Sequence, residues 1–212
     1  MTQVVPTAGA EQIAAIVDAI APRYRSAVVL SAGTGLRQGE CFGLTVDRVD
    51  FLRRQLRVDR QLVKLTGQDP KLTPPKTNAS YRTVPLPAVV IDALASHLKE
   101  FGEGPERLIF TNEPGKPINR TRFSDAWKPA VVAAGAPGAR FHDLRHHYAS
   151  VLIQAGLNVK VVQERLGHAT ATETLDTDAH LWPADEDRTR AAIDSVWRSH
   201  VSEVCQSEGI EK

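Results

Sequence analysis

Residues 141–147 read FHDLRHH, and residues 166–168 read LGH. His142 and Arg145, three residues apart, share one face of an expected helix. His168 follows the glycine that is expected to end the next helix. Imidazole and guanidinium groups donate hydrogen bonds to phosphate oxygens, so these residues are candidates for binding phosphate. Taken alone, His168 has an ordinary explanation as a cap near the carbonyls of a helix C-terminus.

Two earlier stretches contain residues of the same kind. Residues 34–40 read TGLRQGE, which places Arg37 after a glycine turn, where its planar guanidinium can bind phosphate oxygens. Glu40, three residues on, can orient that guanidinium, although such a pair is commonly a surface salt bridge. Lys76, in the PKT of residues 75–77, can reach a DNA groove or donate a proton. Taken alone, Lys76 is an exposed loop lysine.

The histidines also raise the question of a metal site. His142 and His146 have the i, i+4 spacing of zinc-binding pairs, but no glutamate lies between them. The two cysteines, Cys41 and Cys205, are remote in sequence and do not form a CxxC pair. We therefore predict no metal site and no cofactor, and two reduced thiols in a cytoplasmic protein.

The order of these stretches is more specific than any one of them. TGLRxGE, PKT, HDLRH and LGH, in that order, resemble the motif series of tyrosine recombinases of the phage or plasmid integrase type. The resemblance runs from about residue 10 to residue 200. It implies an α+β, mainly α fold, the DNA breaking-rejoining enzyme fold of these catalytic domains, with a small antiparallel sheet of about three strands.

The resemblance also implies the role of each residue. Arg37 and Arg145 would bind the scissile phosphate and stabilise the charge that develops in the transition state. His142 and His168 would hydrogen-bond the same phosphate and assist proton transfer. Lys76 would be the general acid that protonates the leaving 5′ oxygen.

Glu40 would support the phosphate-binding residues without contacting the phosphate itself. In this family a tyrosine attacks the phosphate and forms a 3′-phosphotyrosyl link, which conserves the bond energy, so that religation needs neither ATP nor metal.

The nucleophile position departs from the family pattern. Residues 175–177 (LDT) and 180–183 (HLWP) set the register, and Asp178 stands where the tyrosine belongs. The carboxylate is shorter and anionic, and an acyl phosphate formed by its attack would hydrolyse to a nick. The sequence thus leaves the enzymatic status open and favours a chain that binds DNA without cleaving it. An engineered variant, a degenerate natural integrase and a sequence error all account for the aspartate.

The charge distribution indicates a nucleic-acid partner more clearly than the formal net charge of +1 does. Residues 52–82 hold eight basic and two acidic residues, whereas residues 183–212 have a net charge of −3. A basic middle suits a protein that places one face on duplex DNA, and a solvated charged hairpin is the alternative. The candidate DNA-binding residues are Arg53, Arg57, Arg60, Lys64, Lys71 and Arg82.

Hydrophobic periodicity predicts the elements. Strand-like segments are expected at 55–63 and 83–85, with loop or edge between them at 64–75. Helices are expected at 13–20, 36–43, 90–101, 119–134, 142–155 and 157–166, and in the tail.

We predict a recombinase catalytic domain at 1–184 and a C-terminal helical tail at 185–212, without the N-terminal core-binding domain that integrases usually carry. The tail has an apolar stripe with Trp197 and Val201. In the family such a segment packs on a neighbouring protomer; packing on its own domain is the alternative. We expect a monomer without DNA and a possible homo-tetramer on DNA.

No run of about 18 apolar residues predicts a membrane span, and the N-terminus lacks the pattern of a signal peptide, so a cytoplasmic location is expected. The leading hypothesis is a site-specific recombinase catalytic domain whose cleavage step is disabled by Asp178. The alternative is a non-enzymatic DNA-binding or regulatory relic that modulates an active relative. A type IB topoisomerase, which shares the chemistry, is a more distant third.

Overall fold

The computed structural model describes residues 9–64, 68–170, 172, 190–191 and 194–195. The chain divides into two units, residues 1–179 and residues 180–212. The four described residues of the second unit are helical. Asp178 and most of the predicted tail helix, including Trp197 and Val201, lie outside the described residues.

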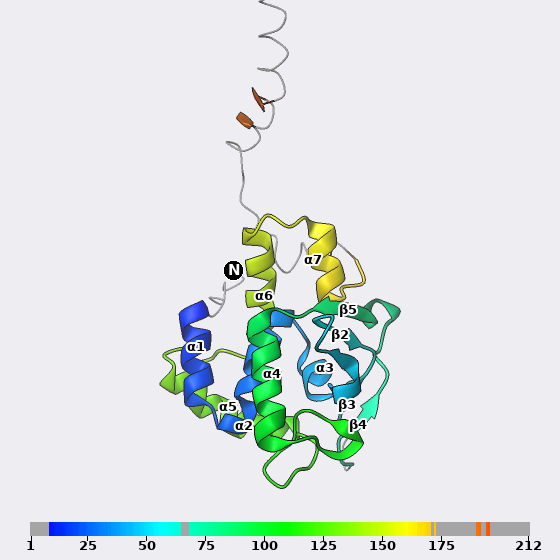
Figure 1. Cartoon of the computed structure of the whole chain (residues 1–212). Helices are drawn as coiled ribbons and strands as arrows, with labels where there is room; N and C mark the ends of the chain where they lie inside the picture. The colour runs from blue at the N-terminus through cyan, green and yellow to red at the C-terminus, as the bar shows by residue number, and fades with distance from the viewer. Residues whose placement is uncertain (1–8, 65–67, 171, 173–189, 192–193, 196–212) are drawn as a thin grey trace, which may run out of the picture. The chain divides into compact units, whose positions relative to one another are not determined.

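Helices make up most of the first unit (Figure 1). The α-helices are α1 (Ala10–Ala19), α2 (Pro22–Thr34), α3 (Gln38–Phe42), α4 (Ala88–Phe101), α5 (Arg120–Ala133), α6 (Asp143–Gln154) and α7 (Val159–Leu166). Short 3₁₀ turns occur at η1 (Val46–Arg48), η2 (Asn78–Ser80) and η3 (Pro105–Arg107). The helices predicted between residues 13 and 166 are confirmed, with small differences at their ends.

Helix α2 is the centre of the helical part and contacts α1, α3, α4 and α6. It is buried on several sides, including its polar residues Ser26, Ser31 and Thr34. The Ser26 hydroxyl donates to the Ala93 carbonyl of α4, and the Thr34 hydroxyl donates to the Leu30 carbonyl within the helix. Hydrophobic periodicity predicts no helix over residues 22–34, because these buried polar residues interrupt the apolar pattern.

The predicted three-stranded antiparallel sheet is confirmed, in the order β1 (Val49–Asp50), β2 (Gln55–Val58) and β5 (Arg82–Pro85). Leu56 pairs with Val84 across its centre, and both side chains are fully buried. A separate antiparallel pair is formed by β3 (Gln61–Val63) and β4 (Lys71–Thr73). The sequence suggested only loop or edge at 64–75, because the prolines around β4 mask a strand with a single pairing partner.

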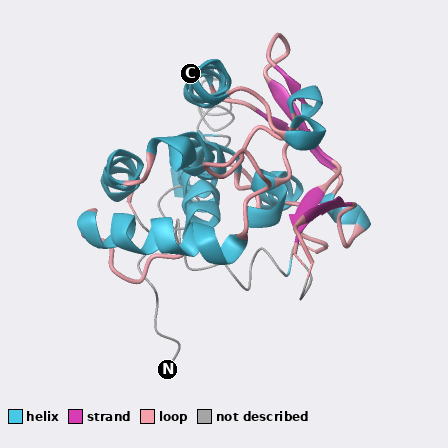
Figure 2. Cartoon of the chain, turned by 90° about the horizontal axis from the view of Figure 1, so that it is seen from below, coloured by secondary structure: helices cyan, strands magenta, loops and turns pink. Residues whose placement is uncertain are grey.

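Strand β3 packs on helix α3. Figure 2 shows the strands gathered on one side of the helices. A Cβ atom at Gly43 would come within 2.6 Å of the backbone nitrogen of Leu62. The close approach of the two backbones therefore requires glycine at this position, and it fixes the hairpin next to the segment that carries Arg37.

An aromatic cluster joins the helices below this hairpin. The Phe123 ring of α5 makes edge contacts with Tyr24, Phe42 and Phe141, with centroid distances of 5.3, 4.8 and 5.3 Å. Trp127 completes the cluster and donates through its indole N–H to the Ala139 carbonyl. These contacts bring α3, α5 and the segment before α6 around one hollow in the surface.

Candidate phosphate-binding groove

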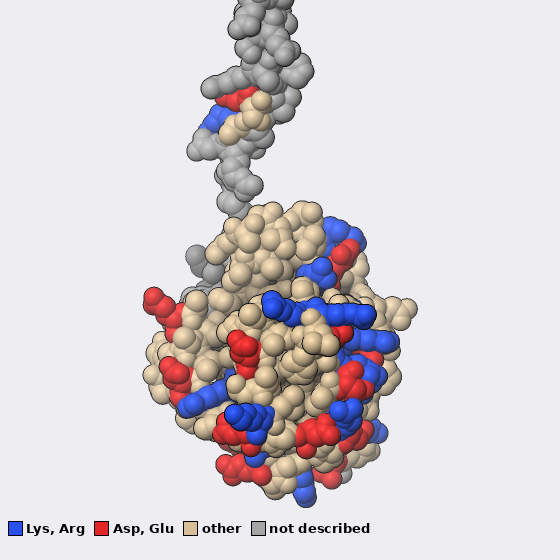
Figure 3. All heavy atoms as spheres, viewed as in Figure 1, with Lys and Arg blue, Asp and Glu red and all other residues tan. Residues whose placement is uncertain are grey.

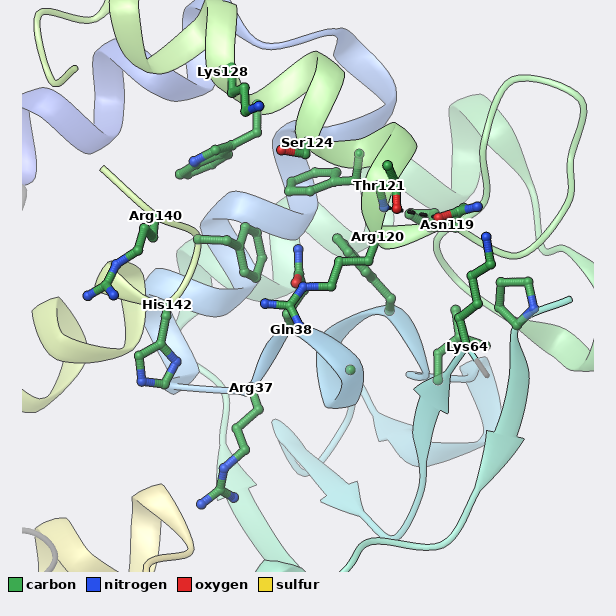
Figure 4. Close-up of a pocket in the computed structure, with 18 of the residues that line it drawn as sticks. Arg37, Gln38, Lys64, Asn119, Arg120, Thr121, Ser124, Lys128, Arg140 and His142 are labelled. Carbon is green, nitrogen blue, oxygen red and sulfur yellow. Dashed lines mark hydrogen bonds between the residues drawn. The ribbon is translucent and has the colours of Figure 1, made fainter. Parts of the chain in front are cut away.

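The hollow is a groove of about 1170 Å³ between α3, the β3–β4 pair, α5 and residues 138–142 (Figure 4). Aromatic side chains of the cluster, Phe42, Phe123, Trp127 and Phe141, form part of its lining. The charged residues that line it are all cations: Arg37, Lys64, Lys76, Arg120, Lys128 and Arg140. Among the described residues no carboxylate lines the groove, so an anion placed in it meets only positive charge.

In the close-up, Arg37, His142 and Arg140 lie on one side of the groove and Lys64 on the other, with the Arg120 side chain reaching between them (Figure 4). The outer surface is different. In the view of Figure 3, lysine and arginine atoms gather along the side that carries the strands, but carboxylates are interspersed among them. The groove is thus a more purely basic surface than that face.

Arg37 stands at the start of α3, and its side chain is 35 % exposed. Its backbone N–H donates to Oε2 of Glu40 over 2.9 Å, and its Nη1 donates to Oε1 over 3.2 Å. Its Nη2 donates to the carbonyl of Gly167 over 3.3 Å. Two acceptors therefore set the plane of the guanidinium while about a third of the side chain stays open to solvent.

Glu40 is buried, with a side chain only 4 % exposed. Burial alone would raise its pKa, but hydrogen bonds and positive charge from Arg82 and Arg37 more than offset this and lower it. Glu40 is therefore an anion between two arginines.

Arg145, on α6, lies in the core next to the turn that precedes Arg37. Its Nη1 donates to the carbonyl of Gly35 over 2.7 Å, and the residue is 4 % exposed. Arg145 thus joins α6 to the TGLR turn, and the carbonyl that it binds lies two residues from Arg37 along the chain. Tyr148 is buried on the same helix.

His142 immediately precedes α6 and lines the groove, partly open to solvent and partly covered by the surrounding protein. Its ring lies edge-on to that of His146, with the centroids 4.9 Å apart. Desolvation, aided by the positive charges of His146 and Arg145, lowers the pKa of His142 to about 4. At neutral pH the imidazole is therefore uncharged, with one nitrogen able to donate and the other able to accept.

His168 is buried and follows Gly167, the left-handed residue that ends α7. Its backbone N–H donates to the Gln163 carbonyl over 3.1 Å, and its own carbonyl accepts from Nε2 of Gln163 over 3.2 Å. Because Arg37 donates to the Gly167 carbonyl, the LGH turn and the TGLR turn meet at this point.

The basic residues predicted at 52–82 divide into groups. Lys64 and Lys76 are exposed and line the groove, and Lys71 is exposed on β4. Arg53 pairs with Asp50, whereas Arg57 and Arg60 pair with Asp59. Three of the expected DNA-binding cations are therefore already neutralised in part by carboxylates close to them in the chain.

Arg82 requires a correction. The sequence placed it among the DNA-binding residues, but its side chain is 5 % exposed and its guanidinium donates to Glu40. Its position on β5 points it into the protein, because β5 alternates between inward and outward residues and packs against α7. Arg82 is therefore a structural cation beneath the site.

Three groove cations were missed by sequence reasoning: Arg120 and Lys128 on α5, and Arg140 before α6. Arg120 and Lys128 are eight residues apart with Ser124 between them, so they lie on one helical face. That spacing was the available signal, but only the tertiary structure shows that this face borders the groove.

Asp143 was also not assigned a role. It is buried, accepts from the Arg140 backbone N–H over 2.8 Å and pairs with its guanidinium, so it shapes the segment that leads to His142. No cluster of three or more histidine, cysteine, aspartate or glutamate side chains suited to a metal ion occurs among the described residues.

Comparison with known proteins identifies the family. The sequence profile of the phage integrase family matches residues 6–181. This chain belongs to the phage integrase family.

Curated relatives of this integrase-family chain include recombinases and phage integrases. A tyrosine recombinase XerC-like protein of Caldanaerobacter subterraneus subsp. tengcongensis is 34 % identical over 196 residues, which cover 82 % of this chain and 50 % of the relative. The integrase of Mycobacterium phage L5 is 31 % identical over 165 residues, covering 76 % of this chain and 44 % of that protein. The chain thus spans about half the length of these relatives.

Solved structures show the fold. The Tn1549 transposon integrase in complex with circular intermediate DNA matches with a TM-score of 0.79 at 26 % identity, covering 92 % of this chain and 68 % of that one. The catalytic domain of bacteriophage HP1 integrase matches with a TM-score of 0.55 at 22 % identity, covering 87 % and 92 %. The tyrosine recombinase catalytic-domain fold expected from the sequence is confirmed. No described helix is both long and apolar enough to span a membrane.

Proposed function

We propose that this chain is the catalytic portion of a site-specific DNA recombinase and that it binds the backbone of duplex DNA in the groove. The observation that carries the proposal is the groove lining, in which five further cations and no carboxylate among the described residues accompany Arg37 and His142. Lysine and arginine side chains that contact phosphates supply the sequence-independent affinity of proteins for DNA. Such contacts are strongest where no carboxylate lies beside the cations.

Each site residue has a role that its surroundings support. Arg37 keeps part of its guanidinium open to solvent, and Arg145 adds a second buried positive charge beside the same turn. Together they would bind a scissile phosphate and stabilise charge on its oxygens. His142, uncharged at neutral pH, would donate to a phosphate oxygen, and His168 would do so from the end of α7. Lys76, exposed at the rim, would protonate the leaving 5′ oxygen.

The residue at the nucleophile position does not fit this chemistry. Asp178 occupies the position of the attacking tyrosine by sequence register and lies outside the described residues. We propose that it leaves the chain able to bind DNA but unable to form the covalent link. Its carboxylate is too short, and it would be electrostatically repelled by the phosphate.

A regulatory relative of a recombinase is the second candidate, and the aspartate at position 178 is what favours it. In that case the chain would join the assemblies of an active recombinase on DNA without cleaving. For the oligomeric state, we propose a monomer without DNA and a homo-tetramer on DNA.

Covalent trapping tests the first proposal. The chain and its Asp178→Tyr variant are each incubated with nicked duplexes whose cleavage releases a short fragment, using the attachment site of the source element and generic sequences. A covalent adduct with the variant alone would establish the active site and the effect of Asp178. An adduct with the unaltered chain would refute the loss of cleavage. No adduct with either would favour the regulatory candidate.

A further inference from the structure

Arg82 is a buried arginine at which several parts of the site meet. Its Nη1 and Nη2 donate to Oε1 and Oε2 of Glu40 over 3.1 and 2.9 Å. Its Nη1 also donates to the Ser80 carbonyl over 3.0 Å, and its Nε donates to the Arg165 carbonyl over 2.9 Å. Every guanidinium nitrogen therefore has an acceptor inside the protein, and Arg82 cannot turn to a DNA phosphate without breaking these bonds.

Arg82 binds the first of the two acceptors of Arg37. Glu40 accepts from Arg82 with both oxygens, and with the same two oxygens it accepts from the side chain and the backbone N–H of Arg37. The side chains of Glu40 and Arg82 are 4 % and 5 % exposed, so water does not replace either partner readily. The rotamer of Glu40 therefore depends on the two guanidinium nitrogens of Arg82 that donate to it. The plane of the Arg37 guanidinium depends on Glu40 in turn.

Arg82 also contacts the segment that carries the second acceptor of Arg37, the Gly167 carbonyl. It binds the carbonyl of Arg165 in the last turn of α7, and a Cβ atom at Gly167 would lie 2.9 Å from its Nη1. In return, the Arg165 guanidinium donates to the Thr83 carbonyl on β5 over 3.1 Å. The end of α7 is thus held against β5 around the Arg82 side chain, consistent with the adjacent positions of α7 and β5 in Figure 1.

We propose that Arg82 is a positioning residue of the phosphate-binding site: it holds both acceptors of Arg37, Glu40 and the Gly167 carbonyl, and so presents the Arg37 guanidinium to phosphate. The inference rests on the proposed function, because it assigns Arg82 a role in that same site. An arginine is required here, since only a planar guanidinium reaches two carboxylate oxygens and two carbonyls at once. Lysine offers the same charge at a single point.

The test is a double-mutant cycle between Arg82→Lys and Arg37→Ala, read out as the affinity for a nicked duplex at fixed ionic strength. Arg82→Lys keeps the charge and is expected to weaken binding about tenfold, the factor for one misplaced charge-assisted hydrogen bond. In the Arg37→Ala background it should add almost nothing, because the group that it positions is gone. Arg23→Lys is the matched control, since Arg23 is a hydrogen-bonded arginine stacked on Phe101 and does not line the groove.

A second measurement separates positioning from DNA binding. Hydrogen exchange of the Arg37 backbone amide, which donates to Glu40, should accelerate in Arg82→Lys and stay unchanged in Arg23→Lys. If Arg82→Lys does not fold, Arg82→Gln, which also removes the guanidinium and leaves Glu40 in place, replaces it in both measurements.

Equal losses from Arg82→Lys with and without Arg37, or unchanged exchange of the Arg37 amide, would overturn the inference. If Arg37→Ala leaves DNA affinity unaltered while the amide exchange responds as expected, the proposed phosphate-binding role of Arg37 fails and the structural part of the inference stands.

Discussion

Gly35 lies directly against the ring of Tyr148: a Cβ atom at residue 35 would come within 2.5 Å of Cδ1 of the tyrosine. Gly35 has a φ of 65°, in the left-handed region, and its carbonyl accepts from Arg145. The turn that leads to Arg37 is therefore packed on α6 with no space for a side chain.

Gly35→Ala should destabilise the protein by about 3 kcal/mol, because the left-handed backbone and the contact with Tyr148 both penalise a methyl group. Urea unfolding measures the loss. Gly115→Ala is the matched control, since Gly115 has a φ of 74° but nothing within 4 Å of the place that a methyl group would take. It should lose only about 1 kcal/mol. Equal losses for the two variants would show that the Tyr148 contact costs nothing.

Neutralising an exposed groove cation should flatten the salt dependence of DNA binding. Arg120→Gln and Lys128→Gln should each reduce the slope of log K against log salt concentration by about 0.9, the value for one lost phosphate contact on B-DNA. The measurement is a titration of a generic duplex at several salt concentrations. Lys99→Gln, on α4 away from the groove lining, should leave the slope unaltered. A similar flattening by all three variants would mean that the groove is not the binding surface.

DNA affinity should rise as the pH falls from neutrality toward about 4. The pKa of His142 is lowered to about 4 in the free protein, and a phosphate placed beside the ring would raise it. Binding then takes up a proton at pH values between the two pKa values, so acidification favours the complex in that range. Binding isotherms at constant ionic strength check this. His142→Gln, which cannot titrate, should lose much of the pH dependence, and an unchanged profile would exclude His142 as the coupled group.

Removal of the tail tests the partner hypothesis for residues 185–212. If Trp197 and Val201 pack on a neighbouring protomer, a chain ending at Ala184 should self-associate less than the full chain in sedimentation runs over a dilution series with duplex DNA present. Identical self-association of the two chains would contradict the partner role. Thermal unfolding of the shortened chain serves as the control for the alternative, because a tail that packs on its own domain would lower the melting temperature when removed.

The sequence by itself determined the family, the helices other than α2 between residues 13 and 166, and the order of the motif residues. The apolar stripe of α4 and the turn glycines at the ends of α2 and α7 are local signals, because periodicity and left-handed backbone depend on residues close in the chain. The spacing of HDLRHH and LGH likewise requires no knowledge of distant contacts.

Only the tertiary structure decided which charges face a ligand. Arg82 and Lys76 belong to the same basic stretch, yet one is buried on Glu40 and the other is exposed at the groove. Arg120 and Lys128 join the groove from a helix far along the chain. The physical reason is that the burial and pairing of a charge depend on partners brought together by packing, such as Glu40 and Arg82, which are 42 residues apart. A charge pattern along the sequence does not contain that information.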